Sequence, residues 1–321
     1  MSYHSAPSLC YNKTGDESEP MSLSKKLFEC VPNVSEGRRS EVIQALRGAV
    51  QSVPDVHLLD VEFDKDHNRS VFTLAGTSDA VEEAVYRLAD TALKHIDLRT
   101  HRGEHPRIGA VDVVPVVPLM DSTVEEAVAL AKKIGAELAR RCKLPIFLYE
   151  EAATAPHRRN LADIRAGEFE GLAEKMAKPE WRPDFGPSSP HPSAGATVVG
   201  ARFFLIAYNI YLDTPDVSIV KKIAKSIREA NGGLPGVKAL GFEIKERRLV
   251  QVSINLTDYR KTGLEAVFER VSEEALAHGV RVVSSEIVGL IPLDALVKTV
   301  EFYLRLEKFT REQVLDSRLM E

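Results

Sequence analysis

The sequence predicts a fold of the α/β class (α+β), made of two tandem ferredoxin-like βαββαβ units whose sheets face each other across a central cleft. The first observation is length, because a chain of 321 residues exceeds the size that one hydrophobic core fills comfortably. The second is that the expected order of helices and strands occurs twice. The third is a pair of matched blocks, in which Asn33 and Pro118 are 85 positions apart and Asn209 and Pro292 are 83 apart.

The matched blocks share residue types as well as spacing. Residues 28–34 and 204–210 both begin with Phe, carry Asn at the sixth position and end in a β-branched residue. Residues 112–119 and 286–293 both begin with a carboxylate and end in Pro-Leu. The repeat is weak, but it favours two similar units over one irregular fold.

Hydrophobic periodicity places the elements in order. Runs of β-branched and aromatic residues predict strands, and apolar residues at intervals of three and four predict helices. In the first half we expect strands at 27–34, 56–63, 69–76, 109–118 and 144–149, and helices at 37–52, 78–95 and 122–141. In the second half we expect strands at 202–212, 237–245, 248–256 and 280–291, and helices at 215–230, 262–278 and 293–306.

Each predicted sheet has helices on one face, so its other face needs cover. The simplest arrangement turns the two open faces toward each other and leaves a cleft between them. Asn33, Asn209 and Asn255 interrupt apolar strands, and we expect them to line this cleft. Taken singly, each Asn is more typical of a turn or a cap.

Composition divides the chain into five parts. Residues 1–24 are polar and poor in large aliphatic side chains, which predicts a disordered tail, and Met21 is a second candidate for the start. We assign residues 25–178 to an N-terminal subdomain, 201–310 to a C-terminal subdomain and 311–321 to a tail. Between the subdomains, residues 179–200 contain five prolines and three glycines, which predicts a stiff connector. Such a segment is either a plain linker or a surface that presents backbone groups to a flat heteroaromatic ligand.

Charge and cysteine content narrow the functional classes. A net charge of −5 gives no reason to expect a nucleic acid partner, and no apolar run is long enough to span a membrane. The first twenty residues lack the apolar core of a secretory signal. Three separated cysteines indicate neither a disulfide framework nor a zinc site. A cytoplasmic location is therefore expected.

Residues 101–112, His-Arg-Gly-Glu-His-Pro-Arg-Ile-Gly-Ala-Val-Asp, are the strongest candidate for a site. Gly103 and Pro106 predict a loop, and loops that deliver titratable groups to a sheet edge often carry the chemistry. Histidine exchanges protons near neutral pH. His101 and His105 would suit a metal only on a helix, so we predict that no metal binds. The alternative is a solvated turn.

A second polar cluster, residues 62–69, joins two predicted strands. It needs no role beyond a hairpin turn. Its carboxylates and arginine are equally suited to a substrate that contains both carboxylates and a cationic amidine, because carboxylates pair with amidinium groups and arginine binds carboxylates in a fork.

Several of these motifs, taken together, resemble the glutamate formiminotransferase family. They are Val-Pro-Asn-Val-Ser-Glu-Gly at 31–37, Asn68-Arg69, Gly-Glu-His-Pro-Arg-Ile-Gly at 103–109, Pro-Asp-Phe-Gly-Pro at 183–187, 195–202 and 288–293. The resemblance spans residues from about 27 to about 306. It implies transfer of a formimino group from N-formimino-L-glutamate to N5 of the co-substrate tetrahydrofolate, a late step of histidine degradation. Because the chain ends soon after the second unit, it is similar to a stand-alone transferase without a cyclodeaminase domain, which leaves a separate cyclodeaminase as a possible partner. A homodimer is implied as well.

The resemblance also assigns roles to residues. It implies that His105 is the catalytic acid/base and that a folate-contacting segment lies in the connector. The implied folate-binding residues are Asp184, Gly186, Pro187, Ser188, Ser189, Pro190, His191, Pro192, Ser193, Ala194 and Gly195.

Residue type suggests the remaining substrate contacts. Arg69 and Arg107 are expected to bind the carboxylates of the substrate, and Glu62 or Asp64 to stabilise the developing amidinium charge. Asn68 completes the predicted substrate-binding set.

Two alternatives remain, a salvage or cyclising enzyme for 5-formyltetrahydrofolate and a folate-binding module without catalysis. The second is less favoured, because a module that only binds has no need of a protonatable group in the loop.

Overall fold

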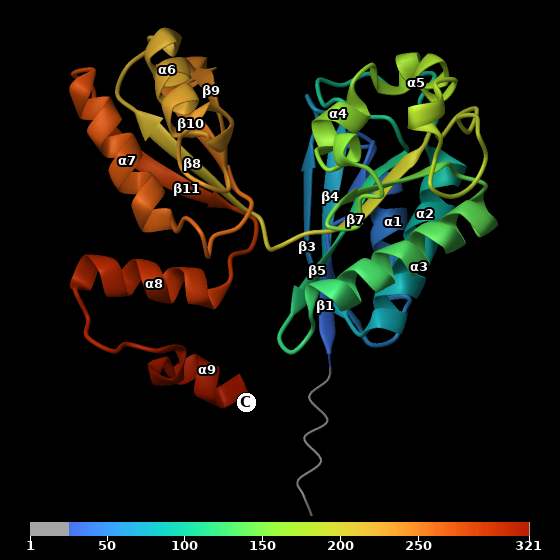
Figure 1. The fold of residues 1–321 in the computed structure, drawn as a ribbon, viewed down its shortest axis with the longest axis horizontal. Coiled ribbons are helices and arrows are strands. Elements are labelled where there is room, and N and C mark those ends of the chain that lie inside the picture. Colours follow the sequence, from blue (N-terminus) through green and yellow to red (C-terminus); the bar gives the residue numbers. More distant parts are fainter. Residues whose placement is uncertain (1–25, 321) are drawn as a thin grey trace, which may run out of the picture.

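The computed structural model describes residues 26–320, arranged as two α/β units side by side (Figure 1). The predicted tail at 1–24 therefore lies outside the described residues. The strands are β1 Leu27–Cys30, β2 Asn33–Val34, β3 Val56–Asp64, β4 Arg69–Gly76, β5 Val111–Leu119, β6 Ile146–Glu150, β7 Thr197–Ala201, β8 Ile206–Leu212, β9 Val237–Ile244, β10 Leu249–Leu256 and β11 Val282–Val288. The α-helices are α1 Ser40–Gln51, α2 Ser78–His95, α3 Val124–Cys142, α4 Leu161–Arg165, α5 Glu168–Met176, α6 Val217–Ile227, α7 Leu264–Ala277, α8 Leu293–Leu304 and α9 Leu315–Met320.

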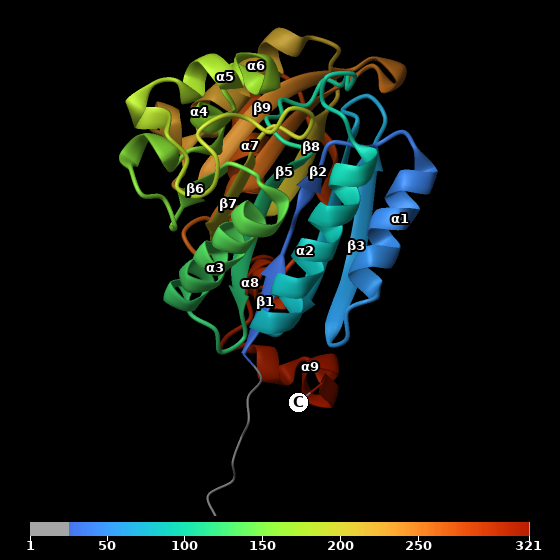
Figure 2. The same cartoon turned by 90° about the vertical axis from the view of Figure 1, so that its right-hand side faces the viewer.

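The first unit contains a seven-stranded sheet. Strand β3 lies at one edge beside β4, and β1 and β2 occupy successive parts of the line between β4 and β5. Beyond β5 come β7 and then β6, both parallel to their neighbours, whereas the other pairs are antiparallel. Helices α1, α2 and α3 cover the outer face of this sheet (Figure 2).

The second unit contains a four-stranded antiparallel sheet with the order β11-β8-β10-β9. Helices α6 and α7 pack on its outer face, where they share a core with β8, β9 and β10 (Figure 1). The apolar stripe of α6 explains its position, because Val220, Ile223, Ala224 and Ile227 are all buried there.

The predicted mixed α/β architecture is confirmed, and the predicted elements of the two βαββαβ sequences all form. Their bounds differ by a few residues; for example, the helix expected at 37–52 spans Ser40–Gln51, and the strand expected at 202–212 begins at Ile206. The described chain contains no helix that is both long and apolar enough to cross a membrane.

The expected connector at 179–200 differs from the structure at its C-terminal end. Residues 197–201 form β7, which is buried between β5 and β6 in the first sheet. A strand in this position is covered on both faces, so it shows an apolar run in place of an alternating pattern. The link between the sheets is therefore the four residues 202–205.

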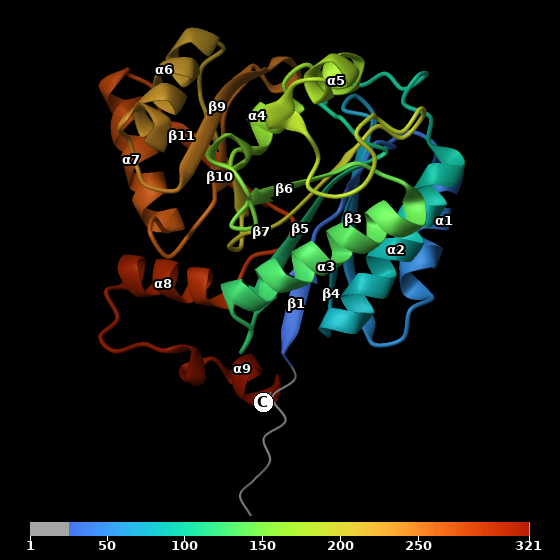
Figure 3. The same cartoon turned by 45° about the vertical axis from the view of Figure 1, so that its right-hand side comes forward.

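Two further segments are more ordered than the sequence indicated. Residues 156–176, where the sequence pattern predicts no helix or strand, form a short 3₁₀ turn followed by α4 and α5. These helices lie above the first sheet near the second unit (Figure 3). The residues assigned to a C-terminal tail contain α9, which lies below α8 (Figure 1).

Candidate functional site

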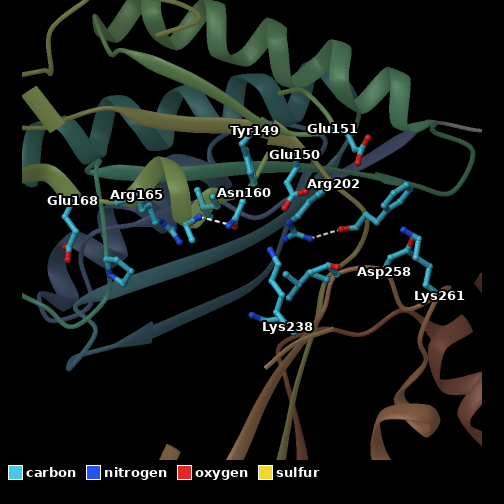
Figure 4. A pocket seen from close by; sticks show the side chains of 18 of the residues that line it. Tyr149, Glu150, Glu151, Asn160, Arg165, Glu168, Arg202, Lys238, Asp258 and Lys261 are labelled. Atoms are coloured by element: carbon cyan, nitrogen blue, oxygen red, sulfur yellow. Dashed lines mark hydrogen bonds and ion pairs between the residues drawn. The ribbon is translucent and has the colours of Figure 1, made fainter. Parts of the chain in front are cut away.

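A cleft separates the two sheets and contains two connected chambers. The His105 chamber, of about 330 Å³, is lined on one side by residues of β1, β2, β4 and β5. The other side is formed by Phe204, Leu205, Ala207, Asn255 and residues 288–290. The Lys238 chamber, of about 580 Å³, continues from it toward α4 (Figure 4). The chambers share the lining residues Tyr149, Leu161, Arg165, Arg202, Leu205 and Asn255.

The alternation of strand residues produces the wall of the His105 chamber. On β4, Arg69, Val71 and Thr73 face the cleft, whereas Ser70, Phe72 and Leu74 are completely buried beneath the helices. The same alternation places Glu29, Val31 and Asn33, along β1 and β2, on the cleft face. Val113 and Pro115 of β5 lie there as well. Of the three asparagines expected there, Asn33 and Asn255 line the chamber, and Asn209 is outside its lining.

His105 reaches the chamber from the loop between α2 and β5, as the sequence indicated. It is half-buried, and burial together with the positive charges of Arg165 and Arg69 lowers the pKa of its imidazole from 6.5 to about 2. The ring is therefore neutral at neutral pH in the ligand-free protein. A neutral imidazole can accept a proton from a substrate amine.

Arg165 is held beside His105 by a buried carboxylate, and the sequence alone did not identify either partner. The Asp112 carboxylate accepts hydrogen bonds from Arg165 Nε at 2.9 Å and from the Ile108 backbone N–H at 2.7 Å. The Asp112 side chain is 2 % exposed and that of Arg165 14 %. One carboxylate therefore holds both the C-terminal end of α4 and the loop that carries His105.

Arg69 and Glu62 line the same chamber and lie close to each other. Arg69 Nε is buried and has no hydrogen-bond partner in the described chain. Burial and the nearby Arg165 charge lower the pKa of Arg69, and burial together with Asp60 raises the pKa of Glu62. An unpartnered guanidinium is ready to receive an anionic group from a ligand.

Glu29 is a further cleft residue that the sequence did not single out. It lies on β1, lines the His105 chamber and is 4 % exposed. Burial raises the pKa of its carboxyl from 4.5 to about 7, and the charge of Arg202 acts in the opposite direction. An acidic residue inside the apolar run Leu-Phe-Glu-Cys-Val was the available signal.

Three of the predicted substrate contacts lie elsewhere. Asp64 is exposed at the rim, where its carboxylate accepts from the His67 backbone N–H at 2.7 Å. Asn68 is buried and accepts from the Gly37 N–H at 2.9 Å. Arg107 is buried and forms ion pairs with Glu168 and Glu170 at 2.7 and 2.8 Å. Asn68 and Arg107 thus stabilise the loops, and Arg165, in place of Arg107, is the second arginine that lines the chamber.

The predicted folate-contacting segment packs on the first unit beside α3. Asp184 forms a buried ion pair with Arg158 at 2.7 Å, and Gly186 has a φ of +87°. None of residues 184–195 lines either chamber as the structure describes them. The segment instead supports the His105 loop, because the Ala194 carbonyl accepts from the Ala110 N–H at 2.9 Å.

The Lys238 chamber is lined by four cationic and four anionic side chains. Arg165 and Arg202 lie on the side of the first unit, and Lys238 and Lys261 on the side of the second (Figure 4). The anionic side chains, equal in number, are Glu150, Glu151, Glu168 and Asp258. Over residues 26–320 no group of three His, Cys, Asp or Glu side chains is arranged to hold a metal ion.

Known proteins are similar in sequence to this chain along nearly its whole length. A model of the N-terminal subdomain of the formiminotransferase domain matches residues 27–202, and a model of the formiminotransferase domain matches residues 207–318. The glutamate formimidoyltransferase of Streptococcus pyogenes serotype M1 is 45% identical over 296 residues, which cover 92% of this chain and 99% of that protein.

Two further relatives extend the comparison. The glutamate formimidoyltransferase of Thermoplasma acidophilum is 46% identical over 295 residues, covering 91% of this chain and 97% of that protein. The formimidoyltransferase-cyclodeaminase of Dictyostelium discoideum is 43% identical over 302 residues, covering 92% of this chain but 56% of the longer protein. On the strength of both family models and of these identities, the chain belongs to the formiminotransferase family.

Proposed function

We propose that this protein is a glutamate formimidoyltransferase, which transfers the formimino group of N-formimino-L-glutamate to N5 of tetrahydrofolate. The observation that carries the proposal is that His105 lies in the cleft with Arg69 and Arg165 close enough to act on its charge. This arrangement offers two cations for an anionic substrate and one proton acceptor close to both. The names of the relatives support the same reaction.

Binding of formiminoglutamate is assigned to the two arginines. Arg69 has a buried, unpartnered Nε, and Arg165 is oriented by Asp112. A substrate carboxylate that bridges them would receive charge-assisted hydrogen bonds, which are about twice as strong as neutral ones. Glu62, on the same side, is placed to pair with the cationic amidinium group.

The chemical step needs one proton acceptor that later becomes a donor. N5 of tetrahydrofolate attacks the amidine carbon, and the N5 proton passes to His105 as the tetrahedral intermediate forms. The bond from that carbon to the glutamate nitrogen then breaks, and His105 returns the proton to this leaving nitrogen. The products are 5-formiminotetrahydrofolate and L-glutamate, and the imidazole ends neutral.

Substrate binding would prepare His105 for this role. The positive charges of Arg69 and Arg165 contribute to the low pKa of about 2 in the free protein. A bound carboxylate neutralises these charges, so it raises the pKa of His105 toward the range in which it accepts a proton. The histidine thus becomes basic when formiminoglutamate is present.

We also propose the tandem ferredoxin-like fold, the folate contact, the homodimer and the cyclodeaminase partner. The element order βαββαβ, with strand orders β3-β4-β1-β5 and β9-β10-β8-β11, supports two tandem ferredoxin-like units. Folate contact by Gly186–Gly195 remains a prediction from family resemblance. A homodimer, which sedimentation equilibrium would detect, and a separate cyclodeaminase partner rest on the same resemblance.

The test is formation of 5-formiminotetrahydrofolate by the wild type and by His105→Ala. We expect the variant to lose roughly 10²–10⁴ in kcat while it still binds tetrahydrofolate. His278→Ala is the control, because His278 is exposed at the end of α7 and outside the lining of both chambers as described. Unchanged turnover by a folded His105→Ala variant would remove this residue from the mechanism.

A further inference from the structure

The carboxylate of Glu29 is buried in the cleft without a bonding partner. Within residues 26–320, its side chain takes part in no hydrogen bond or ion pair, although Arg202 lies close enough to influence its charge. Burying a carboxylate without hydrogen bonds is costly, and other buried carboxylates of this protein, such as Asp112, are fully engaged. Hydrogen bonds from the N–H groups of a ligand would offset this desolvation cost.

The surroundings of Glu29 fit a flat ring. On the first sheet, the apolar side chains of Val31, Val71 and Pro115 line the chamber between Glu29 and the His105 end. Phe204 of the link between the sheets and Leu290 of the second unit add apolar side chains to the lining. An apolar lining with a few polar groups at the ends is typical of sites for planar heterocycles.

The distance from Glu29 to the reacting centre also fits. Asn33 pairs with Val71 near Arg69, which places it at the same end of the chamber as His105. Glu29 lies four residues away along the same strand line, roughly 13 Å at about 3.3 Å per residue. Side chains from both ends reach inward, so a bicyclic ring fills the space that remains between them.

We propose that the Glu29 carboxylate accepts hydrogen bonds from the N3–H and the 2-amino group of the tetrahydrofolate pterin, and so directs N5 toward His105. The inference rests on the proposed function and names the residue that orients its co-substrate. N2 and N3 of a pterin present two parallel donors, which match the two oxygens of a carboxylate. The opposite edge of the ring carries N5.

The cationic amidinium of formiminoglutamate is the competing partner for a carboxylate. Glu62 serves that group better, because it lies on β3 directly opposite Val71, near Arg69 and His105. Glu29 is at the far end of the chamber, beside Ala75 and Val117. A carboxylate there recognises the part of the ligand that is farthest from the reacting nitrogen.

The test compares two probes, 5-formyltetrahydrofolate and its analogue without the 2-amino group, by calorimetric binding to wild type, Glu29→Gln and Glu243→Gln. Glu243 is an exposed carboxylate on β9 and serves as the control. We expect Glu29→Gln to weaken binding of the first probe roughly 10- to 100-fold, as for loss of a charge-assisted hydrogen bond. Wild type should discriminate between the probes by a similar factor, and Glu29→Gln should hardly discriminate.

Steady-state kinetics separate loss of the pterin contact from a general loss of activity in Glu29→Gln. In Glu29→Gln, KM for tetrahydrofolate should rise, whereas KM for formiminoglutamate should change less than about twofold. Equal discrimination between the probes by wild type and Glu29→Gln would refute the contact, and continued turnover by wild type would leave the proposed function intact. If wild type itself neither binds the probes nor turns over, both proposals fail. The wild-type comparison of probes needs no variant, so a folding defect in Glu29→Gln cannot obscure the answer.

Discussion

The buried pair of Asp112 and Arg165 offers the sharpest test of how this cleft is held together. Asp112→Asn keeps the size and shape of the side chain but removes its charge, which leaves the Arg165 guanidinium with a side chain only 14 % exposed and no counter-ion. Removal of one partner from a buried pair costs about 3–5 kcal/mol. Because the amide oxygen can still accept one hydrogen bond, we expect a loss of about 2–3 kcal/mol in the free energy of unfolding.

The same substitution at the surface provides the matched control. Asp90 pairs with Lys94 at 2.6 Å, but both side chains are more than 60% exposed, at 64% and 65%. Asp90→Asn should therefore change the free energy of unfolding by less than about 0.5 kcal/mol. Urea denaturation of both variants measures the difference. Equal stability of Asp112→Asn and Asp90→Asn would show that the pair contributes no more than a surface contact.

Replacement of both partners separates the charge from the packing. Asp112→Asn combined with Arg165→Met removes the uncompensated cation, so it should recover part of the lost stability. It should not recover activity, because Arg165 is assigned to the substrate carboxylate. Recovery of both would contradict the binding role of Arg165.

Three further predictions concern the site and the backbone. The low folded-state pKa of His105, about 2 against 6.5 when unfolded, means that the unfolded chain binds a proton first as pH falls. Below about pH 6.5 the free energy of unfolding of wild type should therefore fall by up to about 1 kcal/mol per pH unit more than that of His105→Ala. Urea denaturation at pH 7, 6 and 5 measures both. An equal fall in the two proteins would contradict the lowered pKa. Arg69→Lys keeps the charge but loses the fork, so KM for formiminoglutamate should rise roughly tenfold, and an unchanged KM would exclude a bidentate contact. Gly195→Ala should destabilise the protein by about 2 kcal/mol or more, because φ is +70° and a Cβ would lie 2.0 Å from the Ile108 carbonyl oxygen. Gly48→Ala lies on the exposed face of α1 with free space around it, so it should stabilise the protein by about 0.5–1 kcal/mol. Thermal unfolding distinguishes the two.

Periodicity in the sequence predicted most of the fold. The helix expected at 78–95 has the same bounds in α2, because its apolar residues recur at helical spacing and are buried there. Strand β7 was missed for a physical reason. Its five residues are all buried, so it has no alternation, and it follows a segment rich in Pro and Gly that is typical of a loop.

The candidate site was predicted only where the chemistry was local in sequence. His105 stood out because its loop combines two histidines with Gly and Pro, and Glu62 and Arg69 followed from a polar hairpin. Arg165 could not be found in this way, since its role depends on Asp112, which lies 53 positions earlier. Arg107 shows the converse error in reasoning from residue type, because its guanidinium is already occupied by Glu168 and Glu170.

The position of β7 has a consequence for synthesis on the ribosome. Strand β6 pairs only with β7 among the described strands, and β7 separates it from β5. Until residues 197–201 have left the exit tunnel, β6 has no partner strand and the edge of β5 stays open. The first unit can therefore complete its sheet only after residue 201. A fragment of residues 26–201 should fold by itself, whereas one that ends at 178 should expose strand edges and aggregate.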